Sequence, residues 1–252
     1  MVGKLLHLWY DEDMKNAKKG WSRGFTKDTH PSVLKISETM RKRQVDNFAK
    51  WREKNKKLGT IKTVYRPFVK DSDLAELIGV TLGDGHIEIF PRTERLIIAA
   101  NSHNIGFVKR YAHFMKKLFE KDPRCMKAKS VNCIRISVYE KFISKRLGIP
   151  AGNRKDSTVG IPRWVWRNKK FLISCLRGLY EAEGSFCVHK ATGTYKMFFS
   201  NKNPVLLSDV DRGLRVLGFH PNRSGYKVQL SAKGEVYAFR ELIQFRKYGT
   251  YK

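Results

Sequence analysis

Apolar residues along the chain fall into two blocks with the same order of predicted elements. In each block, an apolar helical stretch precedes two strand-like stretches, an amphipathic helix, an alternating strand and a closing helix. In the first block these elements cover residues 74–83, 86–90, 95–101, 105–120, 132–138 and 140–147. In the second they cover residues 171–182, 185–188, 195–200, 205–217, 226–231 and 235–245. The pattern predicts two half-domains, residues 73–150 and 163–252, joined by a Gly- and Pro-containing linker over residues 151–162.

The segment before these blocks, residues 1–72, has a different composition. It is polar and basic, with several short runs of lysine and arginine. A proline before it and a glycine after it predict one helix over residues 32–57. Trp9, Trp21 and Trp51 interleave with the cations, which suits packing across a phosphate backbone and equally suits a small apolar anchor on the main body. We expect a basic, mostly helical arm that binds DNA.

The charge of the chain points to a polyanionic partner. Lys and Arg number 51 against 23 Asp and Glu, so the net charge is +28 and the isoelectric point is near 10.1. Solubility of a small domain needs a net charge of only about 2–8. Lysine and arginine displace counterions from phosphates, so nucleic acid is the expected partner. No long uncharged apolar run is present, and a membrane is not expected.

The four cysteines do not form a zinc-binding pattern. Cys125, Cys133, Cys175 and Cys187 include no C-x-x-C pair, and no histidine cluster accompanies them. They are expected to be reduced thiols in an intracellular protein. The apolar stretch within the first ten residues is too short for a signal peptide.

Two short segments repeat the pattern Leu-x-Gly-x-x-x-small-acid-Gly. The first covers residues 77–85 and the second 176–184, and their acids are 183 − 84 = 99 residues apart. Asn104 and Asn203 keep the same offset. A repeat that continues past the motif indicates duplicated half-domains.

Small residues within the two motifs predict close helix packing. Gly79 and Gly83 are four residues apart and share one helix face, as do Gly178 and Ala182. Side chains of this size let two helix backbones approach closely. Packed side by side, the two helices would place their terminal acids at one end of a pseudo-twofold axis.

The terminal acids of the motifs are the candidate catalytic groups. Asp84 and Glu183 would stand at helix C-termini, where the dipole favours cations, and their like charges would repel. A divalent cation relieves both problems, and Mg²⁺ accepts carboxylate, water and phosphate oxygens. The alternative is that Gly85 and Gly184 merely end the helices and leave the acids exposed; two matched copies argue against it.

Over roughly residues 73–252, the sequence resembles the single-chain, two-motif LAGLIDADG homing endonucleases. The matching positions are Leu77, Gly79, Gly83, Asp84 and Gly85, then Leu176, Gly178, Leu179, Ala182, Glu183 and Gly184. The resemblance implies an α+β fold, a pseudo-twofold pair of αββαββα half-domains whose antiparallel sheets form a saddle over DNA. It also implies a monomer that cuts both strands of a long target and serves intron mobility.

The resemblance assigns roles around the cleaved bonds. It makes Asp84 and Glu183 the ligands of Mg²⁺ or another divalent cation such as Mn²⁺, assisted by the backbone carbonyls of Gly83 and Ala182. The resemblance therefore implies that cleavage depends on divalent metal bound by these four residues.

The resemblance also implies polar groups near the attacking water. Asn101 and Asn201 follow the second strand of each half, and Lys227 is the candidate active-site lysine of the second half. Cys133, 94 residues earlier, aligns with Lys227 and is not basic, which puts equal cleavage of the two strands in doubt. In the first half-domain, Lys129 or Arg135 could take the role that Lys227 has in the second.

Polar strand residues are expected to contact DNA. Their mixture of donors and acceptors suits readout of base edges. The expected DNA-binding residues are His86, Glu88, Arg92, Arg95, Lys129, Arg135, Lys190, Lys196, Arg223 and Lys227. His103 and His189 could ligate metal, although polar packing is the more common role of such histidines.

Two other functions are compatible with the same fold. One is an RNA maturase that binds its own intron RNA and assists splicing. The other is a DNA-binding regulator that does not cleave, which loss of one acid would favour. Both Asp84 and Glu183 are present, so the sequence favours the endonuclease.

Overall fold

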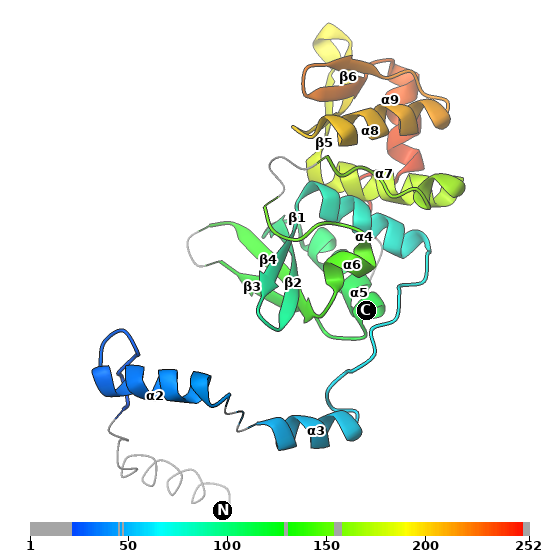
Figure 1. Cartoon of the computed structure of the whole chain (residues 1–252). Coiled ribbons are helices and arrows are strands. Elements are labelled where there is room, and N and C mark those ends of the chain that lie inside the picture. Colours follow the sequence, from blue (N-terminus) through cyan, green and yellow to red (C-terminus); the bar gives the residue numbers. More distant parts are fainter. Residues whose placement is uncertain (1–21, 45, 47, 129–130, 154–157, 249–252) are drawn as a thin grey trace, which may run out of the picture. The chain divides into compact units, whose positions relative to one another are not determined.

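The chain forms two compact units, Met1–Val64 and Tyr65–Lys252 (Figure 1). The computed structural model describes residues 22–44, 46, 48–128, 131–153 and 158–248. The second unit begins before residue 73, where the sequence places the first half-domain. Its lead-in segment packs against the body of this unit: the rings of Phe68 and Phe119 meet edge-on, with centroids 5.1 Å apart.

The first unit contains two helices where the sequence predicts one. They are α2 Pro31–Lys42 and α3 Ala49–Lys57. The predicted helix is interrupted because Gln44 adopts a left-handed conformation, with φ of 48°. A left-handed residue cannot continue a right-handed hydrogen-bond ladder, so α3 starts anew at Ala49.

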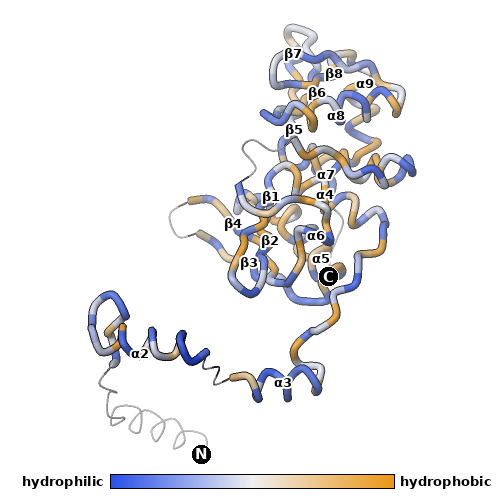
Figure 2. The backbone as a smooth tube through the Cα atoms, viewed as in Figure 1, coloured by the Kyte–Doolittle hydropathy of each residue, from blue (hydrophilic) through white to orange (hydrophobic). Residues whose placement is uncertain are grey.

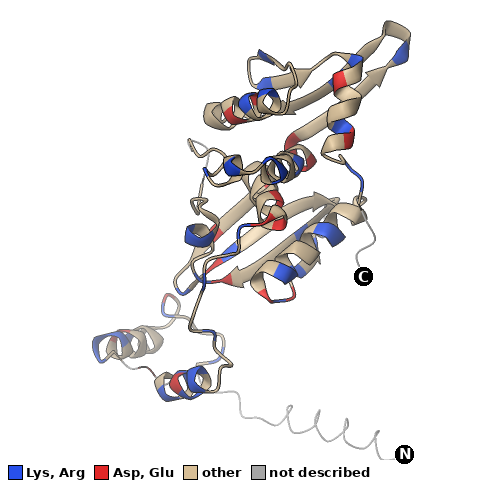
Figure 3. Cartoon of the chain, turned by 90° about the vertical axis from the view of Figure 1, so that its right-hand side faces the viewer, with Lys and Arg blue, Asp and Glu red and all other residues tan. Residues whose placement is uncertain are grey.

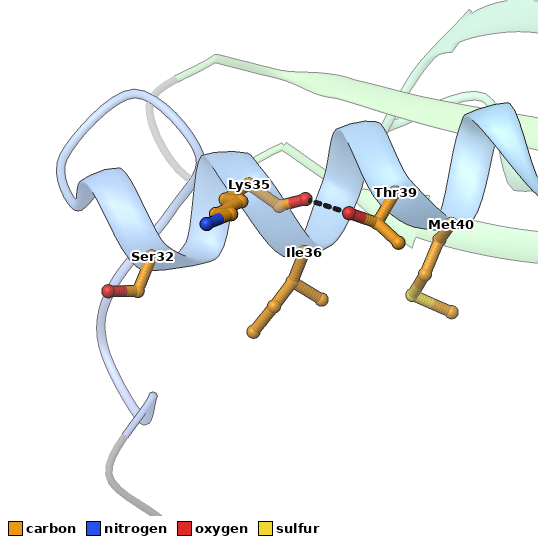
Figure 4. Close-up of a pocket in the computed structure, with 5 residues that line it drawn as sticks. All are labelled: Ser32, Lys35, Ile36, Thr39 and Met40. Atoms are coloured by element: carbon orange, nitrogen blue, oxygen red, sulfur yellow. Dashed lines mark hydrogen bonds between the residues drawn. The ribbon is translucent and has the colours of Figure 1, made fainter.

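Most residues of these two helices are hydrophilic, with a few hydrophobic residues between them (Figure 2). None of the described residues in α2 and α3 is buried, and Trp51 is 57% exposed. Trp9 and Trp21 lie outside the described residues. A groove along α2 is lined, within the described part of this unit, by Ser32, Lys35, Ile36, Thr39 and Met40 (Figure 4). None of these five described residues carries a carboxylate.

The second unit contains the two predicted half-domains. The first comprises α4 Ser72–Gly83, β1 Gly85–Phe90, β2 Thr93–Asn101, α5 Ile105–Phe119, β3 Arg124–Lys127, β4 Cys133–Glu140 and α6 Ile143–Leu147. The second comprises the 3-10 turn η1 Val165–Arg167, α7 Lys169–Glu183, β5 Gly184–His189, η2 Lys190–Thr192, β6 Thr194–Ser200, α8 Pro204–Val216, β7 Asn222–Ser224, β8 Lys227–Leu230 and α9 Lys233–Leu242. The antiparallel sheets have the equivalent orders β1-β2-β4-β3 and β5-β6-β8-β7. The predicted α+β pair of halves is confirmed.

The sequence pattern misses one strand in each half. β3 and β7 are short edge strands, and all their residues are exposed. An exposed edge strand has no buried side to impose the alternation of apolar and polar residues that predicts strands. The closing helix of the first half begins at Ile143, later than predicted, because Phe142 is left-handed with φ of 59°.

Each sheet has one face packed against helices and one open face. Leu96, Ile98 and Ile136 fill the packed face of the first sheet, while Met197 and Phe199 fill that of the second. The alternation of buried and accessible positions along β1, β2 and β6 follows from the two-residue period of strands. Within the described part of the chain, none of the helices combines the length and hydrophobicity that a membrane crossing needs.

The helices α4 and α7 lie side by side between the two sheets (Figure 1). A Cβ atom at Gly79 would lie 2.1 Å from the carbonyl oxygen of Cys175, and one at Gly178 would lie 2.1 Å from that of Glu76. Real Cβ atoms do not approach backbone oxygens so closely. The two backbones can therefore make this contact only because both positions are glycine.

A buried ionic cluster lies beside the glycine contact. The Glu76 carboxylate of α4 accepts two hydrogen bonds from the Arg110 guanidinium of α5, each 2.5 Å long. The Nε of Arg177 in α7 lies 3.4 Å from Glu76 Oε1, and the Tyr111 hydroxyl donates to the same oxygen at 3.3 Å. Because a buried charge needs partners, this cluster fixes how α4 meets α5 and α7.

We predict that Gly79→Ala or Gly178→Ala destabilises the fold by about 3 kcal/mol, because the added methyl group forces the two helix backbones apart. The two substitutions act on one interface, so the double variant should lose less than the sum of the single losses. Urea unfolding followed by circular dichroism measures these differences.

The matched control is Gly234→Ala in the first turn of α9, where a Cβ would meet no atom within 4 Å. An alanine there should be neutral or stabilise by about 0.5–1 kcal/mol. Equal effects at Gly79 and Gly234 would contradict the close packing of α4 and α7.

Candidate active site

The two motif acids stand together where α4 and α7 end. Asp84 caps the C-terminus of α4, and Glu183 is the last residue of α7. A Cβ at Gly83 would lie 2.5 Å from the Cβ of Ala182 and 3.3 Å from the Cγ of Glu183. The last turns of the two helices therefore touch, and the structure brings the predicted carboxylates into one site.

Electrostatics make this pair of carboxylates unfavourable when both are ionised. Burial raises the pKa of Asp84, although its side chain still reaches solvent. Burial and then the charge of Asp84 raise the pKa of Glu183. The negative ends of two helix dipoles act in the same direction. A cation at this point would relieve all three effects.

The donor set fits a hard divalent cation that also takes ligands from its substrate. The described residues contain no group of three or more His, Cys, Asp or Glu side chains able to hold a metal ion. Mg²⁺ does not need such a cage, because it usually binds one or two carboxylates together with water and phosphate oxygens. The last carbonyls of a helix lack helical partners, so those of Gly83 and Ala182 are suited to the same centre.

The two predicted amides occupy different environments. The Asn201 amide donates to Glu183 Oε1 at 3.5 Å, and its own Oδ1 accepts from the backbone N–H of Asn203 at 2.9 Å. Asn101 instead uses its Oδ1 to accept from the backbone N–H of His103 at 2.9 Å and to contact the imidazole at 3.0 Å. Only the amide of the second half meets a motif acid among the described residues.

Both candidate histidines have polar partners in the protein. His103 contacts Asn101 as described, and His189 Nδ1 lies 2.7 Å from the hydroxyl of Thr192. These contacts match the polar-packing alternative for the two residues.

Strand pairing changes the alignment of the two halves. Gly85 pairs with Ile98, which pairs with Ile136 on its other side. In the second half, Gly184 pairs with Phe199, which pairs with Val228. Because the two glycines end equivalent motifs, the strands correspond at an offset of 228 − 136 = 92.

This offset makes Arg135 the half-one counterpart of Lys227. Aligning Cys133 with Lys227 at an offset of 94 is wrong by two residues, because strand alternation repeats every two residues and cannot distinguish the two registers. Both side chains are exposed and alternate with buried neighbours, so both lie on open sheet faces. Each half thus has one basic residue at the same place, and the predicted difference between the halves disappears.

Most of the remaining predicted DNA contacts lie on the open faces or at hairpin ends. Alternation places on the open faces His86, Glu88, Arg95, Arg135, Lys196 and Lys227. Arg92 in the β1–β2 turn and Lys190 in η2 are exposed at the ends of their hairpins. Lys129 lies outside the described residues. Lys and Arg occur throughout both units (Figure 3).

Arg223 does not belong to the open face. It pairs with Val228, a buried residue whose side chain faces the helices, and the Arg223 guanidinium donates to the Ser208 hydroxyl of α8 at 2.9 Å. The expectation that it lies on the open face is wrong: the sequence pattern predicts no strand at residues 222–224, because all three residues are exposed and show no alternation that would fix their register.

One preorganised cluster on the open face was not foreseen. The Arg95 guanidinium donates to Glu88 and, at 2.9 Å, to the Tyr139 hydroxyl. It also lies over two rings, 5.5 Å from the centroid of Phe90 and 5.4 Å from that of Tyr139. Pairing of Glu88 with Arg95 across β1 and β2 could have been inferred from the hairpin, but Tyr139 lies on a strand that is distant in sequence.

No protein-family model and no curated protein sequence matches the chain. Among solved structures, full-length DUF199/WhiA from Thermatoga maritima superposes with a TM-score of 0.50 at 16% identity, over 71% of this chain and 58% of that one. The N-terminal domain of DUF199/WhiA is described as a LAGLIDADG domain. This similarity shows that the chain shares its fold with that protein, in agreement with the α+β fold predicted from the sequence.

Structures of the homing endonuclease I-DmoI are also similar. Its mesophilic variants match with a TM-score of 0.49 at 22% identity, over 68% of this chain and 94% of that one. I-DmoI in complex with DNA and Mn matches with a TM-score of 0.48 at 21% identity, over 68% and 96%.

The raised carboxylate pKa values predict a stability effect with a defined sign. A carboxyl whose pKa is raised by folding favours the folded state at acidic pH, and this contribution is lost as pH rises through the raised pKa. Asp84→Asn should therefore raise the melting temperature at pH 7 in EDTA by roughly 2 °C. The gain should shrink as pH falls toward 4 and as salt screens the charges.

Asp122→Asn, which removes an exposed carboxylate beyond the end of α5, is the control and should show no such gain. Differential scanning calorimetry over this pH range measures both variants. A lower melting temperature for Asp84→Asn at pH 7 would contradict this prediction, because it would show that ionised Asp84 stabilises the metal-free fold.

Proposed function

We propose that the chain is a site-specific endonuclease that hydrolyses phosphodiester bonds in both strands of a long double-stranded DNA target. The observation that carries this proposal is the contact between the ends of α4 and α7, which brings Asp84 and Glu183 into one site. Two carboxylates from pseudo-symmetric halves match two scissile bonds related by the pseudo-twofold symmetry of duplex DNA.

The substrate class follows from charge and shape. A net charge of +28 favours a polyanion, and the open sheet faces carry Glu88 and Gln229, which can accept hydrogen bonds, beside their cations. Such mixtures distinguish base edges in the major groove. Double-stranded DNA therefore fits these faces better than an unspecific polyanion.

Asp84 and Glu183 would hold Mg²⁺ or Mn²⁺, with the carbonyls of Gly83 and Ala182 as further oxygen donors. The bound cation supplies activation of water and neutralisation of the leaving oxygen in phosphodiester hydrolysis. The Asn201 amide, which already donates to Glu183, orients that carboxylate and accepts or donates to a nearby water.

Arg135 and Lys227 supply fixed positive charge at the two equivalent strand positions. Within the described residues, Arg135 has no hydrogen-bond or ion-pair partner, and Lys227 Nζ lies 5.3 Å from the ring centroid of Phe198. Positive charge placed beside a phosphate stabilises the charge that develops during hydrolysis. Since one chain supplies both halves, we propose that it cuts as a monomer.

The proposed function is tested with a plasmid library of candidate target sites. The wild-type chain, Asp84→Asn and Glu183→Gln are each incubated with Mg²⁺ or with EDTA, and the DNA ends are sequenced. We expect double-strand breaks at one long site, present only with Mg²⁺ and reduced at least about 100-fold in both variants. Tight binding without Mg²⁺-dependent cutting, in a library that contains the bound site, would instead favour the non-cleaving regulator. Tighter binding to structured RNA would favour the maturase.

The alignment of Arg135 with Lys227 gives a separate prediction. Arg135→Ala should slow cleavage of one strand by about 100-fold, and Lys227→Ala should slow the other to a similar extent. Each variant should accumulate DNA nicked in one strand, with opposite strand preference, in gels that resolve end-labelled strands.

Lys196→Ala is the control on the same open face, where Lys196 pairs with Cys187 away from the acids. It should weaken DNA binding and reduce, by about 1, the slope of the logarithm of the binding constant against the logarithm of salt concentration. It should not favour cleavage of either strand. If Arg135→Ala and Lys227→Ala affected the same strand, the strand alignment of the two halves would be refuted.

A further inference from the structure

The segment after α9 runs from the second half onto the first. Ile243 and Phe245 are buried, each 1% exposed, and anchor its beginning. Gln244 and Arg246 adopt left-handed conformations with φ of 49° and 54°. Non-glycine residues seldom adopt this conformation, so the path of the segment is held by its contacts.

Two buried side chains of α7 hold this segment in place. Arg177 donates to the carbonyl oxygen of Lys247 at 2.7 Å and to the Gln244 side chain at 3.2 Å. Glu181 accepts from the backbone N–H of Arg246 at 2.5 Å. Both contacts lie on the helix that ends in Glu183.

The segment ends at Tyr248, which contacts both halves. Its hydroxyl donates to Glu181 Oε2 and accepts from the Asn104 amide at 3.2 Å. Its ring lies against the first turn of α5, where a Cβ at Gly106 would come within 2.4 Å of Tyr248 Cδ2. Tyr248 thus spans from α7 to the start of α5.

Asn104 connects this contact to the candidate active site of the first half. It caps α5 by accepting from the Phe107 N–H at 3.3 Å, and its own N–H donates to the carbonyl oxygen of Asn101 at 2.9 Å. The side-chain amide of Asn104 therefore links the loop 101–104 to the Tyr248 hydroxyl. That hydroxyl in turn links the loop to α7, the helix that ends in Glu183.

We propose that Tyr248 is a positioning residue that fixes the Asn101 loop of the first half relative to Glu183. The inference rests on the proposed endonuclease function. The Asn101 amide has no hydrogen bond to a motif acid among the described residues, in contrast to Asn201, so its position depends on the loop that carries it. Misplacement of a positioned group by about 1 Å can slow a reaction by about 100-fold.

The test compares Tyr248→Phe with the wild-type full-length chain on its cleaved site. The variant keeps the ring and loses the hydroxyl bridge. We expect about 10-fold slower cleavage of the strand that Arg135→Ala also slows, unchanged cleavage of the other strand, and DNA affinity within about twofold. Amide hydrogen exchange should become faster at residues 101–107, a readout that does not depend on cleavage.

Gly106→Ala provides a second route to the same effect. The added methyl group displaces the Tyr248 ring, so this variant should reproduce the strand bias, and the double variant should add little to it. Tyr237→Phe removes an exposed phenol from α9 and is the control, with no bias expected.

Equal slowing of both strands, or unchanged strand ratio and unchanged exchange in Tyr248→Phe, would overturn the inference. A wild-type chain that cuts no DNA would instead refute the proposed function, and the inference with it. The wild-type reaction therefore separates the two failures.

Discussion

The contact between α4 and α7 is the constraint on which the rest of the second unit depends. Glycines at positions 79 and 178 let each helix backbone meet a backbone carbonyl group of the other helix. The same contact continues to Gly83 and Ala182, where the helices end. It therefore places two carboxylates together at a point where helix dipoles and mutual repulsion oppose their ionisation. The close approach of the α4 and α7 backbones therefore determines both the packing of the core and the chemistry of the site.

The two halves share their topology but differ in how they support the site. In the second half, Asn201 contacts Glu183 directly. In the first, the corresponding loop is held indirectly, through Asn104 and Tyr248. Glu76 and Arg177 add a buried ionic link at the same helix pair. Two halves within one chain can diverge in this way, because each half needs to fit only the other half and not a copy of itself.

The fold and the acid pair could be predicted because their signals are local. Each copy of the motif shows two small residues four positions apart and an acid before a glycine. The presence of two such copies makes the pattern specific for a pair of packed helices. The register of β4 relative to β8 could not be predicted, because a shift of two residues, from Arg135 to Cys133, preserves the alternation of strand residues. Arg223 was misplaced because an exposed three-residue strand has no alternation to read. Tyr248 gave no signal, since its partner Asn104 is 144 residues away in sequence.

The proposed function requires Asp84 and Glu183 to form one metal centre, and anomalous X-ray diffraction from crystals soaked in Mn²⁺ tests this most directly. Data collected at the manganese edge locate the ion without any need to know the DNA target. We expect an anomalous peak in contact with carboxylate oxygens of both residues, which disappears in Asp84→Asn crystals under the same conditions. Manganese bound only at sites remote from these two acids, in crystals where both side chains are accessible to solvent, would contradict it.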